Sequence, residues 1–314
     1  MPNTDHVTKD LLKDDHIFAD IFNNLFFKNK VIDPDRLKDM NTDEILVDYH
    51  KLFSTEKHRD IMRNALIRHD GRYAYLYLGI ENQNEIDDTM PARVMLYDAL
   101  NYHGQMKIIR NRNKENKSLS KKEYLSGFTK DDRLIPVITL VICWSPEKWT
   151  GPRSIHDMMD PKMTERFKGY IPDYPMNLIS LNELDDETIR SMETKVSLLF
   201  EFLKYSNNSQ KVREYRRDKR FEDIPYEIAR SIKVMSDIDI DLEKNDQGGS
   251  VNMCEGWKVL LEEEKNEGRT EGISIGKTEE RKESLDKLIR YFMNNGRSEE
   301  EAIREADIVF GDPS

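Results

Sequence analysis

Residues 59–83 read RDIMRNALIRHDGRYAYLYLGIENQ, and this stretch decides the fold class of the chain. Residues 60–67 and 73–80 are both β-prone, and the pair Asp70-Gly71 lies between them. An Asp-Gly pair between two such runs is a strong signal for a β-hairpin. The second run is nearly continuous in apolar and aromatic residues, which is typical of a strand covered on both faces of its sheet. The stretch therefore predicts a hairpin at the centre of the fold.

Three polar side chains gather at one end of this hairpin. Asp60 begins the first run, while Glu81 and Gln83, two positions apart, leave the second run on one face. Asp60 stands ten positions before the turn centre at residue 70 and Glu81 eleven after it, so the register places the two carboxylates side by side. They repel each other unless a cation lies between them, and oxygen ligands favour Mg²⁺ or Mn²⁺ over zinc. Such a cation lowers the pKa of a bound water and neutralises charge on a phosphodiester. The alternative is that both acids are simply exposed at strand ends.

The rest of the first 240 residues alternates helical patterns with two further strands. Helices are predicted over residues 11–28, 88–105, 186–206, 208–220 and 223–236, and strands over 134–144 and 177–184. The basic, Asn-rich residues 107–130 are expected to form a connection. The pattern places Cys143 inside an apolar strand, where it is a core residue and not a nucleophile.

The composition changes after residues 241–252, a polar segment that contains paired glycines, and becomes rich in Glu and Lys. We expect an α/β domain over residues 1–238, a linker over 239–251 and a helical segment over 252–314. Glycines recur every four residues in the last segment, at positions 268, 272 and 276, and share one helix face. That spacing suits either close pairing of two helices in a homodimer or a frayed helix.

Charge and hydropathy exclude several classes of protein. The 314 residues carry a net charge of −11, and the apolar runs are shorter than the roughly 20 residues that a transmembrane helix needs. The N-terminus has no apolar signal segment, and two cysteines cannot build a disulfide framework. We therefore expect a cytoplasmic protein with no membrane partner. Residues 107–122 hold seven basic residues and one acidic, and residues 204–220 hold seven and two, which suits either phosphate contact or a solvated surface.

The order of these motifs resembles the Rpn-type PD-(D/E)XK nuclease and transposase family. The residues that carry the resemblance are the Arg59-Asp60 pair, the hairpin, AYLYL at 74–78, IENQ at 80–83, MPAR and Tyr97 within 90–97, FADIFN at 18–23, and the glycine-punctuated acidic helix near the end. The resemblance is clearest over residues 11–100 and weakest over 107–235. It implies a restriction-endonuclease-like fold, with a mixed central sheet flanked by helices, that cuts DNA with a divalent metal.

Carried over residue by residue, the resemblance implies that Asp60 and Glu81 are metal ligands for Mg²⁺, with Mn²⁺ or Ca²⁺ as substitutes. Gln83 takes the place of the lysine usual in the superfamily and can orient water but cannot supply a charge. Asp20 matches the acid of the family's first helix and is expected to join the metal shell, with Asp15 as the alternative.

Further residues are expected to contact DNA. Arg93 and Tyr97 lie four apart on one helix face, where they either hold a phosphate or brace Glu81. Arg110 and Arg112, in the basic stretch, are expected to contact the DNA backbone. The sequence thus predicts a metal-dependent DNA endonuclease that works in recombination, element mobility or defence. The alternative is a nuclease-fold module that no longer cuts, binds DNA or protein, and self-assembles through its C-terminal helix.

Overall fold

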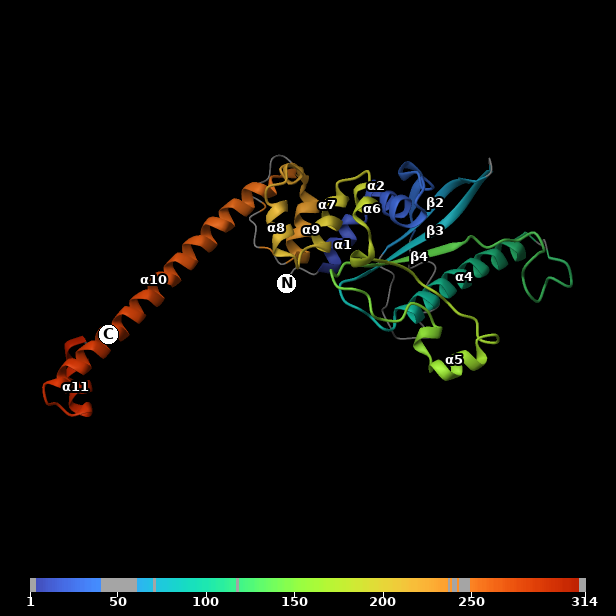
Figure 1. The fold of residues 1–314 in the computed structure, drawn as a ribbon. Helices are drawn as coiled ribbons and strands as arrows, with labels where there is room; N and C mark the ends of the chain where they lie inside the picture. Colours follow the sequence, from blue (N-terminus) through green and yellow to red (C-terminus); the bar gives the residue numbers. More distant parts are fainter. Residues whose placement is uncertain are drawn as a thin grey trace. The chain divides into compact units, whose positions relative to one another are not determined.

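The structure is a computed structural model that describes residues 4–40, 61–69, 72–116, 119–236, 238, 242 and 249–310. The chain divides into two compact units, Met1–Cys254 and Glu255–Ser314. The first unit contains a five-stranded mixed sheet with helices on both of its faces (Figure 1). The α/β class and the restriction-endonuclease-like layout expected from the sequence are therefore confirmed.

The sheet follows the order of the chain. Its strands are β1 (Leu37–Asp39), β2 (Ile61–His69), β3 (Arg72–Gln83), β4 (Val137–Cys143) and β5 (Asn177–Ser180), neighbours in that order. The first three are antiparallel neighbours, whereas β4 and β5 run parallel to β3. Within the hairpin Ile61 pairs with Ile80 and His69 with Arg72. This is the register that the sequence predicts from a turn centred at residue 70.

Helix α4 (Met90–Glu115) covers one face of the sheet. Met90 and Val94 pack against Val141 and Cys143 of β4, so Cys143 belongs to the core as expected. Burial raises the pKa of the Cys143 thiol above its ordinary value, which keeps it protonated and unreactive at neutral pH.

The expectation that this helix ends near residue 105 is wrong. It continues for a further ten residues, through the stretch that the sequence suggests is a connection. Gly and Pro are absent from 105–115, and polarity alone does not end a helix. Side chains on this half also bond to the segment that leads into β4: Gln105 Nε2 donates to the Ile135 carbonyl over 3.0 Å.

A second layer of helices covers the opposite face. It includes α1 (Thr4–Leu11), α2 (Asp15–Asp20), the π-helix η1 (Ile21–Phe27), α7 (Val196–Lys204) and α9 (Tyr226–Ser236). Trp144, directly after β4, meets Phe200 of α7 with ring centroids 4.9 Å apart. The guanidinium of Arg63 from β2 lies 5.2 Å from the Phe18 ring centroid of α2.

The single helix predicted over residues 11–28 is instead three elements. The chain leaves the helical conformation after Leu11, and the Asp14 side chain then caps α2 by accepting hydrogen bonds from the amides of His16 and Ile17. An N-cap aspartate starts a new helix because it satisfies amides that have no intrahelical partner. The apolar stripe that motivated the prediction is still buried, since Phe18 and Phe22 are 0% exposed.

The remaining elements of this unit are short. They are η2 (Pro34–Arg36), η3 (His156–Met158), α5 (Pro161–Phe167), η4 (Leu181–Glu183), α6 (Asp186–Arg190), α8 (Ser209–Tyr215), η5 (Lys219–Phe221), β6 (Ile224–Pro225) and β7 (Ser250–Val251). Most of the expected linker, 239–251, lies outside the described residues. At its end, β7 pairs with β6.

The second unit consists of helix α10 (Met253–Asn294), which begins in the first unit, and α11 (Glu299–Phe310). A reciprocal capping box starts α11, since the Ser298 amide donates to Glu301 Oε2 and the Glu301 amide to Ser298 Oγ. Within the described chain, no helix is both long enough and apolar enough to cross a membrane. The cytoplasmic location stays a prediction.

Candidate active site

Glu81, near the carboxyl end of β3, is the centre of a buried charged group. Its side chain is 0% exposed, and its Oε2 lies 3.3 Å from Nη2 of Arg93 on α4. The same guanidinium places Nη1 at 2.6 Å from Oδ2 of Asp87, in the loop between β3 and α4. An ionised carboxylate inside a protein is costly unless a positive charge compensates it. Arg93 therefore supplies the compensating charge for two acids at once.

The first turns of α4 hold Arg93 in place. Tyr97 lies one helical turn further on, and the Arg93 guanidinium carbon is 6.0 Å from its ring centroid, as their spacing predicts. Burial by itself lowers the pKa of Arg93, but its hydrogen bonds to Asp87 and Tyr97 and the charge of Glu81 raise it above the ordinary value. Of the two roles that the sequence suggests for Arg93, the structure shows the contact with Glu81.

Asp87 is an acid that the sequence reasoning did not single out. Burial raises the pKa of Asp87, but hydrogen bonds from Thr89 and Arg93 lower it by more, so the pKa lies below the ordinary value. Asp87 is therefore ionised at neutral pH. An acid at the entry of a helix is so common that its position six residues before Arg93 carries little signal.

Gln83 and Asp60 complete the set expected from the sequence. Gln83 is half-buried and, two residues after Glu81 in the same strand, shares its side of the sheet. Its carbonyl accepts a hydrogen bond from the Trp144 amide over 2.9 Å, so the ends of β3 and the segment after β4 are locked together. Asp60 lies outside the described residues; the first described pair of the hairpin beside it is Ile61 with Ile80.

A second buried acid, Asp98, fastens α4 to the sheet. Its Oδ1 accepts a hydrogen bond from Thr139 Oγ1 of β4 over 2.6 Å, and its Oδ2 accepts one from the Tyr174 hydroxyl over 2.5 Å. Asp98 is only 4% exposed. These bonds link α4, β4 and the segment before β5, and this gives the helix that carries Arg93 a fixed position.

Asp20, expected as a further metal ligand, has a structural role in this fold. Its carboxylate accepts hydrogen bonds from the amides of Glu193 and Thr194 over 3.0 and 2.7 Å, and from the Thr194 hydroxyl over 2.6 Å. Asn24 Nδ2 donates a fourth, over 2.5 Å. A carboxylate has about four acceptor positions, so these donors occupy all of them. Metal ligation by Asp20 stays a prediction without geometric support.

Asp15, the alternative to Asp20, forms an ion pair with Arg63 of β2. Arg63 stands opposite Leu78 in the hairpin, and paired residues of two strands share a face. That face is the one covered by α2, whereas Glu81 meets α4. The structure therefore brings neither Asp15 nor Asp20 to Glu81.

Arg110 and Arg112 lie far along α4 from Glu81 and have intramolecular partners. Arg110 Nε donates to the Ser126 carbonyl over 2.9 Å, and Arg112 Nη2 lies 2.7 Å from Asp132 Oδ1. Seventeen residues of helix separate Arg93 from Arg110, a distance of about 25 Å. Contact of either arginine with DNA stays a prediction.

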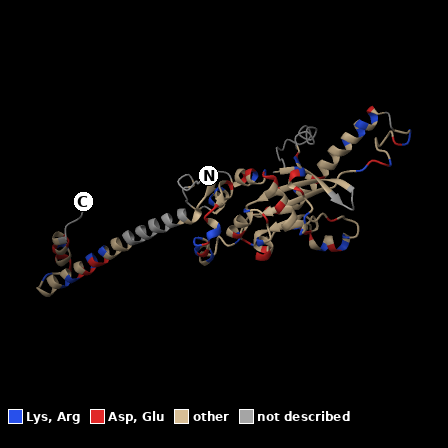
Figure 2. Cartoon of the chain, turned by 90° about the horizontal axis from the view of Figure 1, so that it is seen from above, with Lys and Arg blue, Asp and Glu red and all other residues tan. Residues whose placement is uncertain are grey.

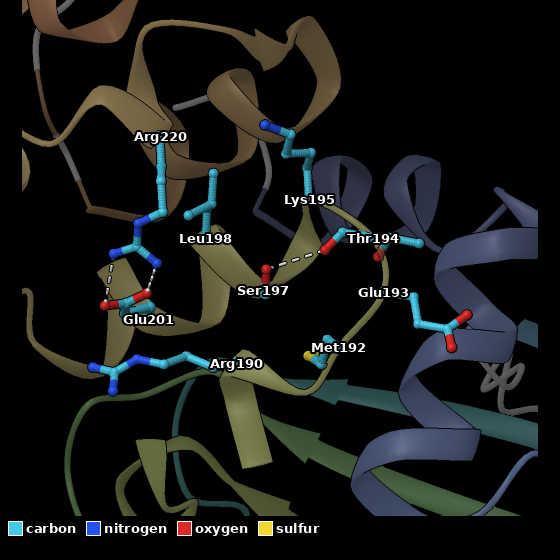
Figure 3. Close-up of a pocket in the computed structure, with 9 residues that line it drawn as sticks. All are labelled: Arg190, Met192, Glu193, Thr194, Lys195, Ser197, Leu198, Glu201 and Arg220. Atoms are coloured by element: carbon cyan, nitrogen blue, oxygen red, sulfur yellow. Dashed lines mark hydrogen bonds and ion pairs between the residues drawn. The ribbon is translucent and has the colours of Figure 1, made fainter. Parts of the chain in front are cut away.

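A pocket of about 310 Å³ lies beside α7 (Figure 3), and Glu81 is not among the residues that line it. Its lining residues are Arg190, Met192, Glu193, Thr194, Lys195, Ser197, Leu198, Glu201 and Arg220. The guanidinium of Arg220 makes two contacts with the Glu201 carboxylate, at 2.8 and 3.1 Å, and this pairing neutralises its charge. The pocket holds no residue expected from the sequence to do chemistry, so the Glu81 group is the stronger candidate site.

The oxygen donors at the end of β3 are of the kind that Mg²⁺ binds. In the part of the chain that the structure describes, no group of three or more His, Cys, Asp or Glu side chains is arranged to hold a metal ion. Glu81 and Gln83 provide a carboxylate and an amide oxygen on one side of the sheet. They fit a divalent site only if Asp60 supplies the further carboxylate.

Comparison with known proteins identifies a family. The family model described as "Putative transposase, YhgA-like" matches residues 4–218, which includes the sheet, α4 and the Glu81 group. No curated protein and no solved structure matches the chain. The family resemblance inferred from the sequence is confirmed.

Proposed function

This chain belongs to the YhgA-like transposase family, and from that premise we propose that it is a metal-dependent DNA endonuclease. The observation that supports the proposal is the position of Glu81: fully buried near the end of the central strand, beside Arg93, in a hairpin whose register pairs Ile61 with Ile80. Functional sites commonly hold a carboxylate in place with hydrogen bonds from a supporting side chain, as Arg93 does here.

We assign the roles from the chemistry of each side chain. Asp60 and Glu81 would hold a Mg²⁺ ion, which supplies positive charge against the charge that builds on the scissile phosphate. Gln83 can donate and accept hydrogen bonds and would orient the attacking water, and hydrolysis would leave 5′-phosphate and 3′-hydroxyl ends.

Arg93 has a positioning role in this proposal. Its guanidinium holds Glu81 from one side and is itself held by Asp87, so the carboxylate cannot rotate freely within the interior. Because Gln83 carries no charge, Arg93 is also the cation that the described residues place nearest to Glu81. It partly replaces the charge that a lysine at position 83 would supply.

A second function is favoured by the same contact. If the Arg93–Glu81 pair is permanent, it satisfies Glu81 without any metal, and the protein is a module that binds DNA or protein without cutting it. The neutral Gln83 and the net charge of −11 agree with this alternative.

Plasmid nicking separates the two functions. Purified protein is incubated with supercoiled DNA in Mg²⁺, Mn²⁺, Ca²⁺ or EDTA, beside Glu81→Gln and Asp60→Asn variants and an exposed-residue control, Tyr170→Ala. Nicking that requires metal and is lost in the two acid variants supports the endonuclease. DNA binding without nicking in any metal, unchanged in both variants, would establish the binding module.

We also propose that the chain self-associates through α10. Its described part exposes Ile273 and Ile275 at 51% and 53%, beside the predicted glycine face at Gly272 and Gly276. Light scattering on the full chain tests this: a dimer that becomes a monomer in Ile273→Glu supports it, and a monomeric wild type refutes it.

A further inference from the structure

The segment that follows α4 ends in an apolar tip. Residues 120–127, here called the arm tip, form two consecutive turns in which the Tyr124 amide donates to the Ser120 carbonyl and the Gly127 amide to the Glu123 carbonyl. Tyr124 is 69% exposed and Leu125 is 96% exposed. Single exposed apolar residues are ordinary on protein surfaces, but an adjacent exposed pair in one short segment is not accounted for by packing.

The arm tip is held in one conformation by α4. Arg110 Nε donates to the Ser126 carbonyl over 2.9 Å, and Asn113 Nδ2 donates to the Gly127 carbonyl over 3.0 Å. Gly127 has a φ of +70°, and a Cβ at this position would lie 2.6 Å from Cγ of Arg110. Backbone geometry and close contact both require glycine here, so the C-terminal end of the arm tip is anchored to α4.

The charge around the arm tip is opposite to that of the whole chain. Residues 107–133 contain nine basic and four acidic residues, a net charge of +5, whereas the chain carries −11. Lys121 and Lys122 are exposed, and Glu123, which accepts a hydrogen bond from the Ser120 amide, separates them from the apolar pair. Figure 2 shows Lys and Arg gathered on the last turns of α4 and on the loop after it. An exposed apolar pair with lysines on one side fits a polyanion that can also expose flat apolar surfaces, and DNA does so when a base step is unstacked.

We propose that the arm tip is a DNA wedge: Lys121 and Lys122 contact backbone phosphates while Tyr124 and Leu125 insert against the bases and unstack a step. Apolar side chains that enter a base step in this way kink the duplex. The inference rests on the proposed action on DNA and adds a contact remote from Glu81. Since about 25 Å of α4 separates Arg93 from Arg110, the wedge would meet the duplex about seven base pairs from the scissile bond when α4 lies along the duplex axis, at 3.4 Å per base pair.

Fluorescence anisotropy with a labelled 30-base-pair duplex in EDTA tests the wedge independently of cleavage. Tyr124→Ala/Leu125→Ala is expected to weaken binding at least tenfold and to leave the salt dependence unchanged, because stacking is lost but no phosphate contact is. Lys121→Gln/Lys122→Gln is expected to lower the slope of log K against log salt by about 1.8. Tyr170→Ala, which removes a tyrosine that is 88% exposed beside Lys168, is the matched control and should bind as the wild type does.

A fluorescent reporter tests insertion directly. In Tyr124→Trp the new indole should be quenched when it stacks on bases, whereas the native tryptophans, Trp144, Trp149 and Trp257, are at most 3% exposed and give a constant background. The melting temperatures of all variants should be equal because the substituted side chains are exposed. Equal values would exclude misfolding as the cause of any loss of affinity.

Each outcome bears on the wedge. Quenching by DNA together with the loss of affinity supports it. DNA binding that is unaffected in both double variants overturns it and leaves the endonuclease proposal intact. A blue shift of the Tyr124→Trp emission on addition of anionic vesicles, with no change on addition of DNA, overturns it in favour of a membrane surface. Absence of DNA binding by the wild type overturns both proposals, and nicking without any change in the variants overturns the wedge alone.

Discussion

Asp20 and Glu81 are both acids with almost no solvent exposure, 4% and 0%, yet their surroundings differ in kind. Asp20 is surrounded by neutral donors, two of them backbone amides, and its carboxylate is saturated. Glu81 faces a guanidinium that it shares with Asp87. Neutral backbone donors fix a carboxylate permanently as part of the fold, whereas a shared arginine can exchange one anionic partner for another. The comparison indicates that burial alone does not identify a functional acid; the identity of the partners does.

Among these variants, Glu81→Gln is expected to cause the largest fall in the rate of DNA nicking. The substitution keeps the shape of the side chain but removes the charge, and Arg93 retains Asp87. We expect DNA nicking to fall about a thousandfold, which corresponds to about 4 kcal/mol of transition-state stabilisation. The free energy of unfolding should change by less than about 1 kcal/mol. Nicking rates and urea denaturation measure the two quantities. A variant that nicks as fast as the wild type would remove Glu81 from the site.

Asp20→Ala should have the opposite effect: the fold should lose stability, while the metal requirement of nicking should not change. It leaves the amides of Glu193 and Thr194 and the Thr194 hydroxyl without an acceptor in a buried position, and we expect a loss of about 3 kcal/mol in the free energy of unfolding. At a temperature where the variant stays folded, its Mg²⁺ requirement should match that of the wild type. A variant of normal stability with an altered metal requirement would restore Asp20 to the metal shell.

Arg93→Met removes the cation that distinguishes the surroundings of Glu81 from those of Asp20. Glu81 would then lose its compensating charge, and its burial together with the nearby Asp87 would disfavour its ionised form. We expect about a tenfold lower nicking rate and an acid limb of the pH–rate profile that moves to higher pH. Arg93→Lys keeps the charge, so its acid limb should stay near that of the wild type. An acid limb that stays in place in both variants would show that the charge of Arg93 does not act on Glu81.

The smallest effect concerns acid stability. The folded-state pKa of Asp87 lies below its ordinary value, so ionised Asp87 stabilises the fold at every pH above about 4. This contribution is lost as the pH falls through the folded-state pKa, where the carboxylate becomes protonated. The difference in melting temperature between the wild type and Asp87→Asn should therefore be constant from pH 7 to 5 and shrink below pH 4. A difference that is as large at pH 2 as at pH 7 would contradict the assignment.

The sequence by itself determined the β2–β3 hairpin, its register and the position of Glu81 near a strand end. These depend on one Asp-Gly turn and the two-residue period of a strand, which are local properties of the chain. It also determined that Arg93 and Tyr97 share a helix face, because residues four positions apart are neighbours on a helix. The break after Leu11 was equally local, since Asp14 caps α2, but the apolar stripe across residues 11–28 outweighed that signal.

Only the tertiary structure decided what each acid contacts. Thr194 meets Asp20 across 174 residues of chain, and no period or spacing in the sequence encodes that contact. The same holds for α4, whose second half looks like a basic connection until the segment 126–135 folds back onto it. Local patterns fix elements because they arise from neighbouring residues, whereas the partner of a buried charge is set by which elements pack together.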